Sequence, residues 1–494
     1  MVRRLILAIV AALVVLVAVA AGAAYWFFVR DGFRRALEAQ ATAWIGEPVR
    51  IGAARAQFLP RLAIQLEDIR VGDPVQLALG RVELAADIRP LLAGRIENAD
   101  VRVSDSGIDM PLPFGLPQPD GTSAGATSGA AVRIVSIRSI ALRNVRLRSR
   151  GREIVVSADS SLDDTTLSLR RFTADAGGTT LAVEGVVALS PRVDAQLKAT
   201  ANRLDLDELI ALAAAFAPEP AARPATDRPA PRIAAALSAG QATAGAVQMR
   251  QFTTELGLDG DSMALNRLRF EMFGGRYEGA VTARLGTRLS AMLESRITDL
   301  DVAQLAAFGG VPDTITGRLS GAGTFVGSGA DVAQLLRDVR GNGTAAIVEG
   351  SIRRLHLVRT VVLFFGRPAP GAGEGTDRFD RLDTEFSLAN RVLRAQAFSL
   401  RSTDADIAGT GSLNLDTDTL DGRADVLLSE GLSAQAGTDL YRYTREGNRV
   451  VLPAAIGGTL AMPRLAIDAA AAARRGLRNE IERRLKGVLE GPGR

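Results

Sequence analysis

Apolar and polar residues alternate with a period of two through most of this chain. Leu62, Ile64 and Leu66 form one such series, and Val82 and Leu84 begin the next. Successive side chains of a β-strand point to opposite faces of a sheet, so each series predicts a strand with one apolar face and one polar face. The pattern therefore predicts a mainly β fold with a few short helices.

The alternation slips by one residue inside the first of these strands. Leu66 belongs to one parity, whereas Ile69 and Val71 belong to the other. An extra residue in one strand shifts the alternation in this way, so we predict a β-bulge across Glu67 and Asp68.

A hairpin unit recurs at three places in the chain. Each copy has an apolar strand, a short polar or glycine turn, and a second strand that carries a glycine and then alternating apolar residues. The copies are Leu167 to Leu189, Met263 to Leu285 and Leu393 to Leu415. Such repeats predict an elongated, twisted, repeating β-sheet in which each unit packs mainly on its neighbours. The glycines from Gly317 to Gly329 lack the spacing of a phosphate-binding loop, and we assign them to strand turns and bulges.

An uncharged run of 25 residues, Leu5 to Val29, lies near the amino terminus. As a helix it is about 37 Å long, enough to cross a hydrocarbon core of about 30 Å, so we predict a transmembrane helix. The alternative is a cleaved signal peptide, because Ala18-Val19-Ala20 offers a small-residue cleavage site. Arginines flank both ends of the run, so the distribution of positive charge leaves the orientation open.

Short helices are predicted where an aspartate precedes an apolar stretch, since its carboxylate accepts hydrogen bonds from first-turn N–H groups. The three segments with this pattern begin at Leu204, Asp301 and Asp331. The segment from Ala469 to Glu490 predicts a basic amphipathic helix. Two roles for this helix stay open: docking on the end of the sheet, and contact with a membrane surface or a partner.

Three stretches rich in Pro, Gly, Ala and Ser predict exposed loops or linkers. With them the chain divides into a stub (1–4), a transmembrane helix (5–29), a β region (30–109), a loop (110–131), a second β region ending in a helix (132–216), a linker (217–232), a third β region (233–468) with a loop at 366–377, and the terminal helix (469–494).

The composition excludes most familiar catalytic machinery. The chain has no cysteine and a single histidine, His356, so thiolate or histidine metal sites and cysteine nucleophiles are not expected. Ser123 lies in a G-x-S-x-G match within a low-complexity stretch, without the strand-turn-helix context of a nucleophile. The net charge of +4 comes from 59 basic and 55 acidic residues, which argues against nucleic-acid binding. We therefore predict a protein that is not an enzyme, with no catalytic residue, metal site or cofactor.

Several segments, in this order, resemble the AsmA family of bacterial envelope proteins. The amino-terminal ones follow the predicted transmembrane helix, and the others lie in the carboxy-terminal half. They are Ala43–Ile51, Pro60–Gly72, Asp87–Ile96, Thr298–Asp301, Thr316–Gly323, Leu335–Gly343 and Val348–Gly350. The chain thus resembles a member of this family over nearly its whole length.

The resemblance implies a single-pass anchor in the inner membrane of a Gram-negative bacterium, with the body in the periplasm. It also implies a twisted β-sheet curled into a groove with an apolar concave face, and a role in outer-membrane biogenesis through phospholipid transport between the membranes. Phospholipids, the inner membrane, and outer-membrane or periplasmic proteins are then the expected partners. No catalytic residues are carried over from the family.

Two sets of candidate site residues follow. The candidate groove lining is Leu62, Ile64, Leu66, Val82, Leu84, Phe398 and Leu400. The candidate membrane or partner contact is Arg474, Arg475, Arg478, Arg483, Arg484 and Lys486. An alternative function is an assembly or regulatory factor for the targeting and insertion of outer-membrane proteins, which holds a polypeptide on exposed strand edges or on the apolar face.

Overall fold

A computed structural model describes residues 32–57, 61–87, 89–90, 95–111, 133–216, 230–352, 377–435, 445–446 and 448–489. Most of these residues lie in strands, which confirms the prediction of a mainly β chain with a few short helices. No helix within these ranges is long and apolar enough to cross a membrane. The predicted transmembrane segment at 5–29 lies outside them, as do Ser123, His356 and most of the three predicted loops.

The chain divides into two compact units, Met1–Gln248 and Met249–Arg494. The first contains α2 (Gly32–Ile45), β1 (Val49–Gln57), β2 (Leu62–Val71), β3 (Leu77–Ala86), β4 (Arg95–Ile96), β5 (Ala99–Met110), β6 (Arg133–Ile134), β7 (Ser136–Ser149), β8 (Arg152–Asp163), β9 (Thr166–Ala176), β10 (Thr179–Ala188), β11 (Asp194–Asp205), α4 (Leu206–Phe216) and β12 (Arg232–Ala244).

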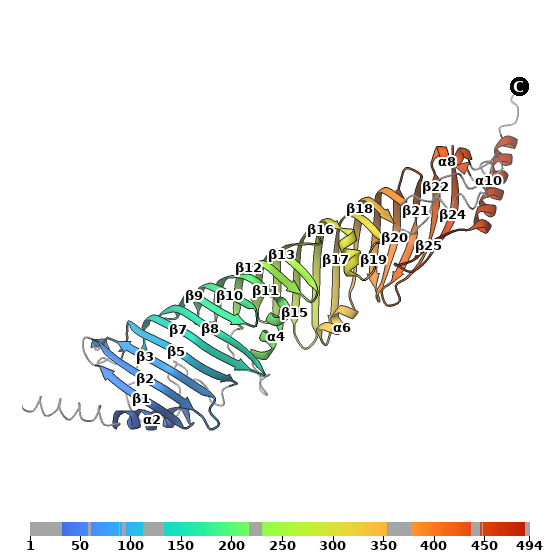
Figure 1. Cartoon of the computed structure of the whole chain (residues 1–494). Helices are drawn as coiled ribbons and strands as arrows, with labels where there is room; N and C mark the ends of the chain where they lie inside the picture. Colours follow the sequence, from blue (N-terminus) through green and yellow to red (C-terminus); the bar gives the residue numbers. More distant parts are fainter. Residues whose placement is uncertain are drawn as a thin grey trace, which may run out of the picture. The chain divides into compact units, whose positions relative to one another are not determined.

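Strands of the first unit pair in chain order, as Figure 1 shows in blue to green, except that the short strands β4 and β6 pair with each other in a separate sheet. Most pairs are antiparallel, but β5–β7, β11–β12 and β4–β6 are parallel. A parallel pair needs a crossover connection. The connection from β5 to β7 contains the loop predicted at 110–131, and the connection from β11 to β12 contains α4 and the linker predicted at 217–232.

The second unit begins within β13 (Val247–Asp259) and is antiparallel in all its described pairs. Its further elements are β14 (Ser262–Met272), β15 (Gly275–Leu285), β16 (Leu289–Asp301), α5 (Val302–Phe308), β17 (Ile315–Gly329), α6 (Val332–Arg337), β18 (Arg340–Ile352), β19 (Asp377–Ala389), β20 (Val392–Arg401), β21 (Ala405–Asn414), β22 (Thr419–Leu428), α8 (Glu430–Gln435), β23 (Arg445–Glu446), β24 (Arg449–Gly458), β25 (Pro463–Ile467) and α10 (Ala469–Leu489).

The three predicted hairpins are present as β9–β10, β14–β15 and β20–β21, each within one residue of its predicted bounds. The predicted helices are present as well. Asp301 caps α5 by accepting from the backbone N–H groups of Ala303 and Gln304, and Asp331 caps α6 by accepting from that of Gln334. These local elements follow from local signals.

The slip of the alternation in β2 has a different cause from the predicted bulge. Pairing with β1 and β3 keeps one register on both sides of Asp68, so no residue is inserted. Instead, Asp68 adopts a left-handed backbone with φ of 53°. Leu66 and Ile69 consequently pack in the same buried cluster, on one face of the sheet. The bulge prediction at Glu67 and Asp68 was therefore wrong, although the slip that prompted it is real.

Left-handed residues recur in neighbouring strands of the first unit. Asp105 in β5 has φ of 53°, and Asn144 in β7 has φ of 52°. Between Asp68 and Asp105 lies Gly80 of β3, where a Cβ atom would stand 2.5 Å from the carbonyl oxygen of Asp105. These left-handed residues lie at neighbouring positions of adjacent strands. Each shifts the alternation of its own strand by one residue, so the apolar residues before and after it stay on one face of the sheet.

Two clusters of buried apolar residues occur within the described ranges. In the first unit, α2 lays Leu37, Ala41 and Ile45 over Ile51 and Ile69. In the second unit, the cluster is formed by β19 to β25, and its members are Phe379, Leu400, Ala405, Ile407, Ala424, Val426, Leu428, Val450, Leu452, Ala454 and Leu465. The helix α2 was not predicted, because nothing in 32–45 carries a strong helix-start signal.

Candidate functional site

The predicted groove residues of the first unit lie together on one face of the sheet. Leu66 pairs directly with Val82, and Ile64 pairs with Leu84. Directly paired residues of neighbouring strands point to the same face. The row continues through β5 and β7, and its further members are Val101, Val103, Ile140 and Leu142. Segments far apart in sequence therefore build one apolar surface.

This apolar surface is closed at one side and accessible at the other. Val82 is 8% exposed and belongs to the cluster under α2, against which Leu66 also packs. Leu84 is 39% exposed, and Leu62 and Ile64 are half-buried and outside that cluster. We call Leu62, Ile64 and Leu84 the open strip. Val82 and Leu66 are packing residues, whereas the open strip is accessible to a ligand.

The opposite face of the same strands is polar. Arg102 donates to Glu83 at 2.8 Å, and Arg81 pairs with Glu67 at 3.4 Å. A cleft of 640 Å³ spans these strands, and charged members of its lining are Arg55, Glu83, Asp100, Arg102 and Arg138. Glu83 pairs with Arg102, and Asp100 pairs with Arg138, so these four charges of the lining neutralise one another.

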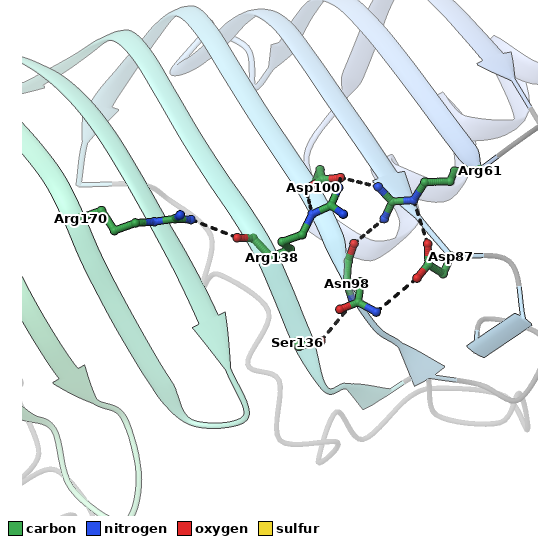
Figure 2. Close-up of polar contacts among 7 residues, drawn as sticks. All are labelled: Arg61, Asp87, Asn98, Asp100, Ser136, Arg138 and Arg170. Atoms are coloured by element: carbon green, nitrogen blue, oxygen red, sulfur yellow. Dashed lines mark hydrogen bonds and ion pairs between the residues drawn. The ribbon is translucent and has the colours of Figure 1, made fainter.

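A network of ion pairs lies at the ends of these strands, and its members Asp100 and Arg138 line the cleft on the polar face (Figure 2). Arg61, just before Leu62, donates to Asp87 at 2.8 Å and to Asp100 at 2.6 Å. Arg138 of β7 also donates to Asp100, with one contact at 3.1 Å. Burial raises the pKa of Asp100, but hydrogen bonds from Arg138 and Arg61 outweigh this effect and hold the pKa below its usual value.

The same network shifts the guanidinium of Arg61 in the opposite sense. The hydrogen bond to Asp100 raises the pKa of Arg61, with Asp87 contributing in the same direction against the effect of burial. Two arginines and two aspartates thus join the ends of β2, β3, β5 and β7. Sequence reasoning missed this network, because its members come from four strands and only the register brings them together.

In the second unit, Phe398 and Leu400 also share one face of the sheet. Phe398 pairs with Thr384, and Leu400 pairs with Leu382 and Ile407. Leu400 is 7% exposed and is part of the buried cluster, while Phe398 packs partly buried against it. Leu400 is therefore a packing residue, and Phe398 is the more accessible of the two candidates.

Aromatic rings lie over glycines on this face of the second unit. A Cβ atom on Gly341 would stand 2.4 Å from the ring of Phe325, and one on Gly343 would stand 2.8 Å from the ring of Phe386. The two rings stack with their centroids 6.4 Å apart. These glycines occur within strands and leave room for rings that lie flat against the sheet. Gly321, Gly323 and Gly327 also lie inside β17, so their assignment to turns and bulges was wrong.

Gly317 fits the original assignment, since its φ of 131° coincides with a register shift between Thr316 and Arg318. The available signal for the aromatic surface was the position of Phe325 within a period-two series of glycines, Gly321, Gly323 and Gly327, in β17. A second cleft, of 900 Å³, lies over β16 to β21, and its lining includes Arg296, Arg381, Asp383, Glu385 and Phe398. Within it, Arg381 pairs with Asp383 at 2.7 Å.

The terminal helix α10 spans Ala469–Leu489, as predicted to within one residue. Arg475 donates to Asp425 at 3.1 Å, whereas Arg474 and Arg478 are exposed. The side chains of Arg483, Arg484 and Lys486 lie outside those the structure describes. Among the described residues, no group of three or more acidic or histidine side chains forms a site for a metal ion.

A comparison of the chain with protein families, with curated proteins and with solved structures finds no match. The chemistry of the surfaces above is consequently the basis for a functional proposal. The first unit has an accessible apolar strip and a self-neutralised ion-pair network at the strand ends, and the second unit has flat aromatic rings.

Proposed function

We propose that this chain binds phospholipid acyl chains on the apolar face of its β-sheet and conducts them between the inner and outer membranes of a Gram-negative bacterium. In this proposal the segment Leu5–Val29 is a single membrane span, and the body lies in the periplasm. The proposal keeps the resemblance to the AsmA family described above, and with it a role in outer-membrane biogenesis.

The open strip is the single observation that carries the proposal. The strip is 39% exposed at Leu84 and has half-buried neighbours. Moving this apolar surface from water into contact with hydrocarbon lowers the free energy. Each CH₂ group of an acyl chain removed from water contributes about 0.8 kcal/mol and requires no directional contact. Acyl chains therefore suit a surface that has apolar residues and no converging polar groups.

The ion-pair network at the strand ends is compatible with the same occupant. Arg61, Asp87, Asp100 and Arg138 satisfy one another there. They present no uncompensated charge that would hold a phosphate in one place. Weak, non-directional contacts allow a lipid to move along the surface as well as to bind it.

A pair of double variants tests the proposal within the first unit. Ile64→Asn with Leu84→Asn places amides on the open strip at directly paired positions. Ala63→Asn with Ala85→Asn places the same groups on the opposite face, at the adjacent pair of the same strands. We expect the first variant to carry several-fold less co-purified phospholipid than the wild type, and the second to carry the same amount.

The lipid content of the full chain, extracted and measured by mass spectrometry, gives the readout. Circular dichroism is the folding control, and we expect both variants to keep their β-structure. Equal lipid content in the two folded variants would contradict a lipid site on the apolar face.

The alternative is an assembly factor that holds an outer-membrane polypeptide. One of its two modes, addition of a strand at an exposed edge, is disfavoured at β1. Glu38 of α2 accepts from the backbone N–H of Ile51 at 2.8 Å, and Thr42 accepts from that of Val49 at 3.0 Å. At Val49 and Ile51 this edge is already hydrogen-bonded, so a strand added there would have to displace α2. The other mode, binding on the apolar face, would compete with lipid.

A further inference from the structure

The terminal helix α10 docks on the second unit through its small residues. Ala472 is 5% exposed, and Gly476, one turn later, is also buried. Asp468 ties the start of the helix to the sheet: its backbone N–H donates to the carbonyl of Pro453 at 2.8 Å, and its carboxylate accepts from the N–H of Ala471 at 2.8 Å. The docked face thus contributes little apolar area.

The large apolar residues of this helix point away from the docked face. Leu477 is 66% exposed, and Ile481, one turn further along, is 51% exposed. A helix that only closed the end of a sheet would turn such residues inward and leave alanine and glycine outside. The orientation in α10 is the reverse, so the outward face is built for contact with something else.

Arginines accompany these apolar residues on the outward face. Arg474 and Arg478 are exposed and lie one turn apart, beside Leu477 and Ile481. The segment Ala469–Leu489 holds six basic residues against two acidic ones, which makes it strongly positive. Its charge is therefore complementary to an anionic surface.

We propose that the outward face of α10 binds an anionic lipid bilayer, as a membrane contact separate from the apolar strip of the first unit. Leu477 and Ile481 enter the boundary between headgroups and acyl chains, and Arg474 and Arg478 contact the lipid phosphates. Arginine interspersed with large apolar residues suits a headgroup layer, where both kinds of group are accommodated at nearly the same depth. A protein groove would call for an uninterrupted apolar stripe.

Vesicle capture tests this contact with the full chain. The chain, held in nanodiscs of phosphatidylcholine and immobilised by an amino-terminal tag, is exposed to dye-labelled vesicles. One set contains phosphatidylglycerol and phosphatidylcholine in equal parts, and the other contains phosphatidylcholine alone. We expect capture of the anionic vesicles, and at least about tenfold less capture of the neutral ones.

Two variants separate the apolar and ionic parts of the contact. Leu477→Asp with Ile481→Asp, and Arg474→Glu with Arg478→Glu, are each expected to lower capture about tenfold. Arg394→Glu with Arg423→Glu changes the charge equally at two exposed strand positions and serves as the matched control. The control is expected to capture vesicles as the wild type does, and capture by the wild type is expected to fall as salt is added.

Undiminished capture by both helix variants would overturn the proposal, as would equal capture of anionic and neutral vesicles. So would a stable protein partner isolated on α10 together with no vesicle capture. Phospholipid that co-purifies with the chain is measured in the same preparations. An unchanged amount in the helix variants separates this contact from the acyl-chain site, so either proposal can fail alone.

Discussion

Single residues decide how this sheet keeps one face apolar. Asp68, Asp105 and Asn144 adopt left-handed backbones inside strands, a conformation that aspartate and asparagine tolerate better than most residues. In the second unit, glycines make room for rings in the same way that Gly80 makes room for a backbone. Residues on neighbouring strands restrict which side chain fits at each of these positions. A larger side chain there should therefore disturb the packing between strands.

A substitution at Gly350 tests this at one residue. A Cβ atom there would stand 2.1 Å from the ring of Phe379, which is buried in the core cluster. We expect Gly350→Ala to lower the free energy of unfolding of the second unit by about 1–3 kcal/mol, the usual cost of overpacking. Gly257→Ala in β13, where the nearest atom is 4.0 Å away, is the control and should change far less. Urea denaturation followed by circular dichroism measures both, and equal effects would refute the packing argument.

Asp100 predicts a specific dependence of stability on pH. Its pKa is lower in the folded state than in the unfolded one, where it is about 3.9. The carboxylate therefore stabilises the fold above that unfolded value, and the contribution is lost as the pH falls through the folded-state pKa.

Asp100→Asn removes this contribution. The difference in unfolding free energy between the wild type and the variant should be constant from about pH 7 to pH 5 and should shrink below about pH 4. Asp68→Asn keeps the size of the side chain and its tolerance of a left-handed backbone, and it changes a carboxylate that is 62% exposed, so we expect it to matter little at any pH. A difference for Asp100→Asn that stays constant down to pH 2 would show that the ion pairs do not stabilise the fold.

At the scale of elements, α2 has two tasks. It covers the buried half of the apolar face with Leu37, Ala41 and Ile45, and its polar side chains occupy the outer edge of β1. Arg34 completes the arrangement by donating to Glu38 at 2.9 Å and to the carbonyl of Ile51 at 3.2 Å. An unprotected edge strand is a template for pairing with another chain.

Removing the edge protection should have two effects. Glu38→Ala frees the N–H of Ile51, which we expect to lower the free energy of unfolding by about 1–3 kcal/mol. We also expect it to promote association of the chain through β1. Gln40→Ala, an exposed position on the same helix, is the control. Analytical ultracentrifugation measures association, and a monomeric Glu38→Ala variant with wild-type stability would contradict a protective role.

At the scale of the whole molecule, local signals foretold the elements and non-local register determined the surfaces. The period of two predicted strands, the three hairpins fell within a residue of their bounds, and the aspartate caps marked α5 and α6. The network around Asp100 and the parallel pairs β5–β7, β11–β12 and β4–β6 could not be foreseen, because they depend on which strands meet.

The candidate site was predicted as a face and not as a list of accessible residues. The alternation placed Leu62, Ile64, Leu66, Val82 and Leu84 on one side, and the pairings put them there. It could not distinguish the open strip from Val82, because burial under α2 is a tertiary effect of a helix that the sequence did not reveal. The same holds for Leu400, which the cluster of β19 to β25 buries.

Whether lipid occupies the open strip can be measured by site-specific photo-crosslinking in living bacteria. A benzophenone amino acid replaces Ile64 in one strain and Ala63, its neighbour on the opposite face, in another. After irradiation, mass spectrometry of the purified full chain identifies the adducts. We expect phospholipid adducts at position 64 and few at position 63. Adducts with a polypeptide at position 64, or equal lipid adducts at both positions, would contradict this expectation.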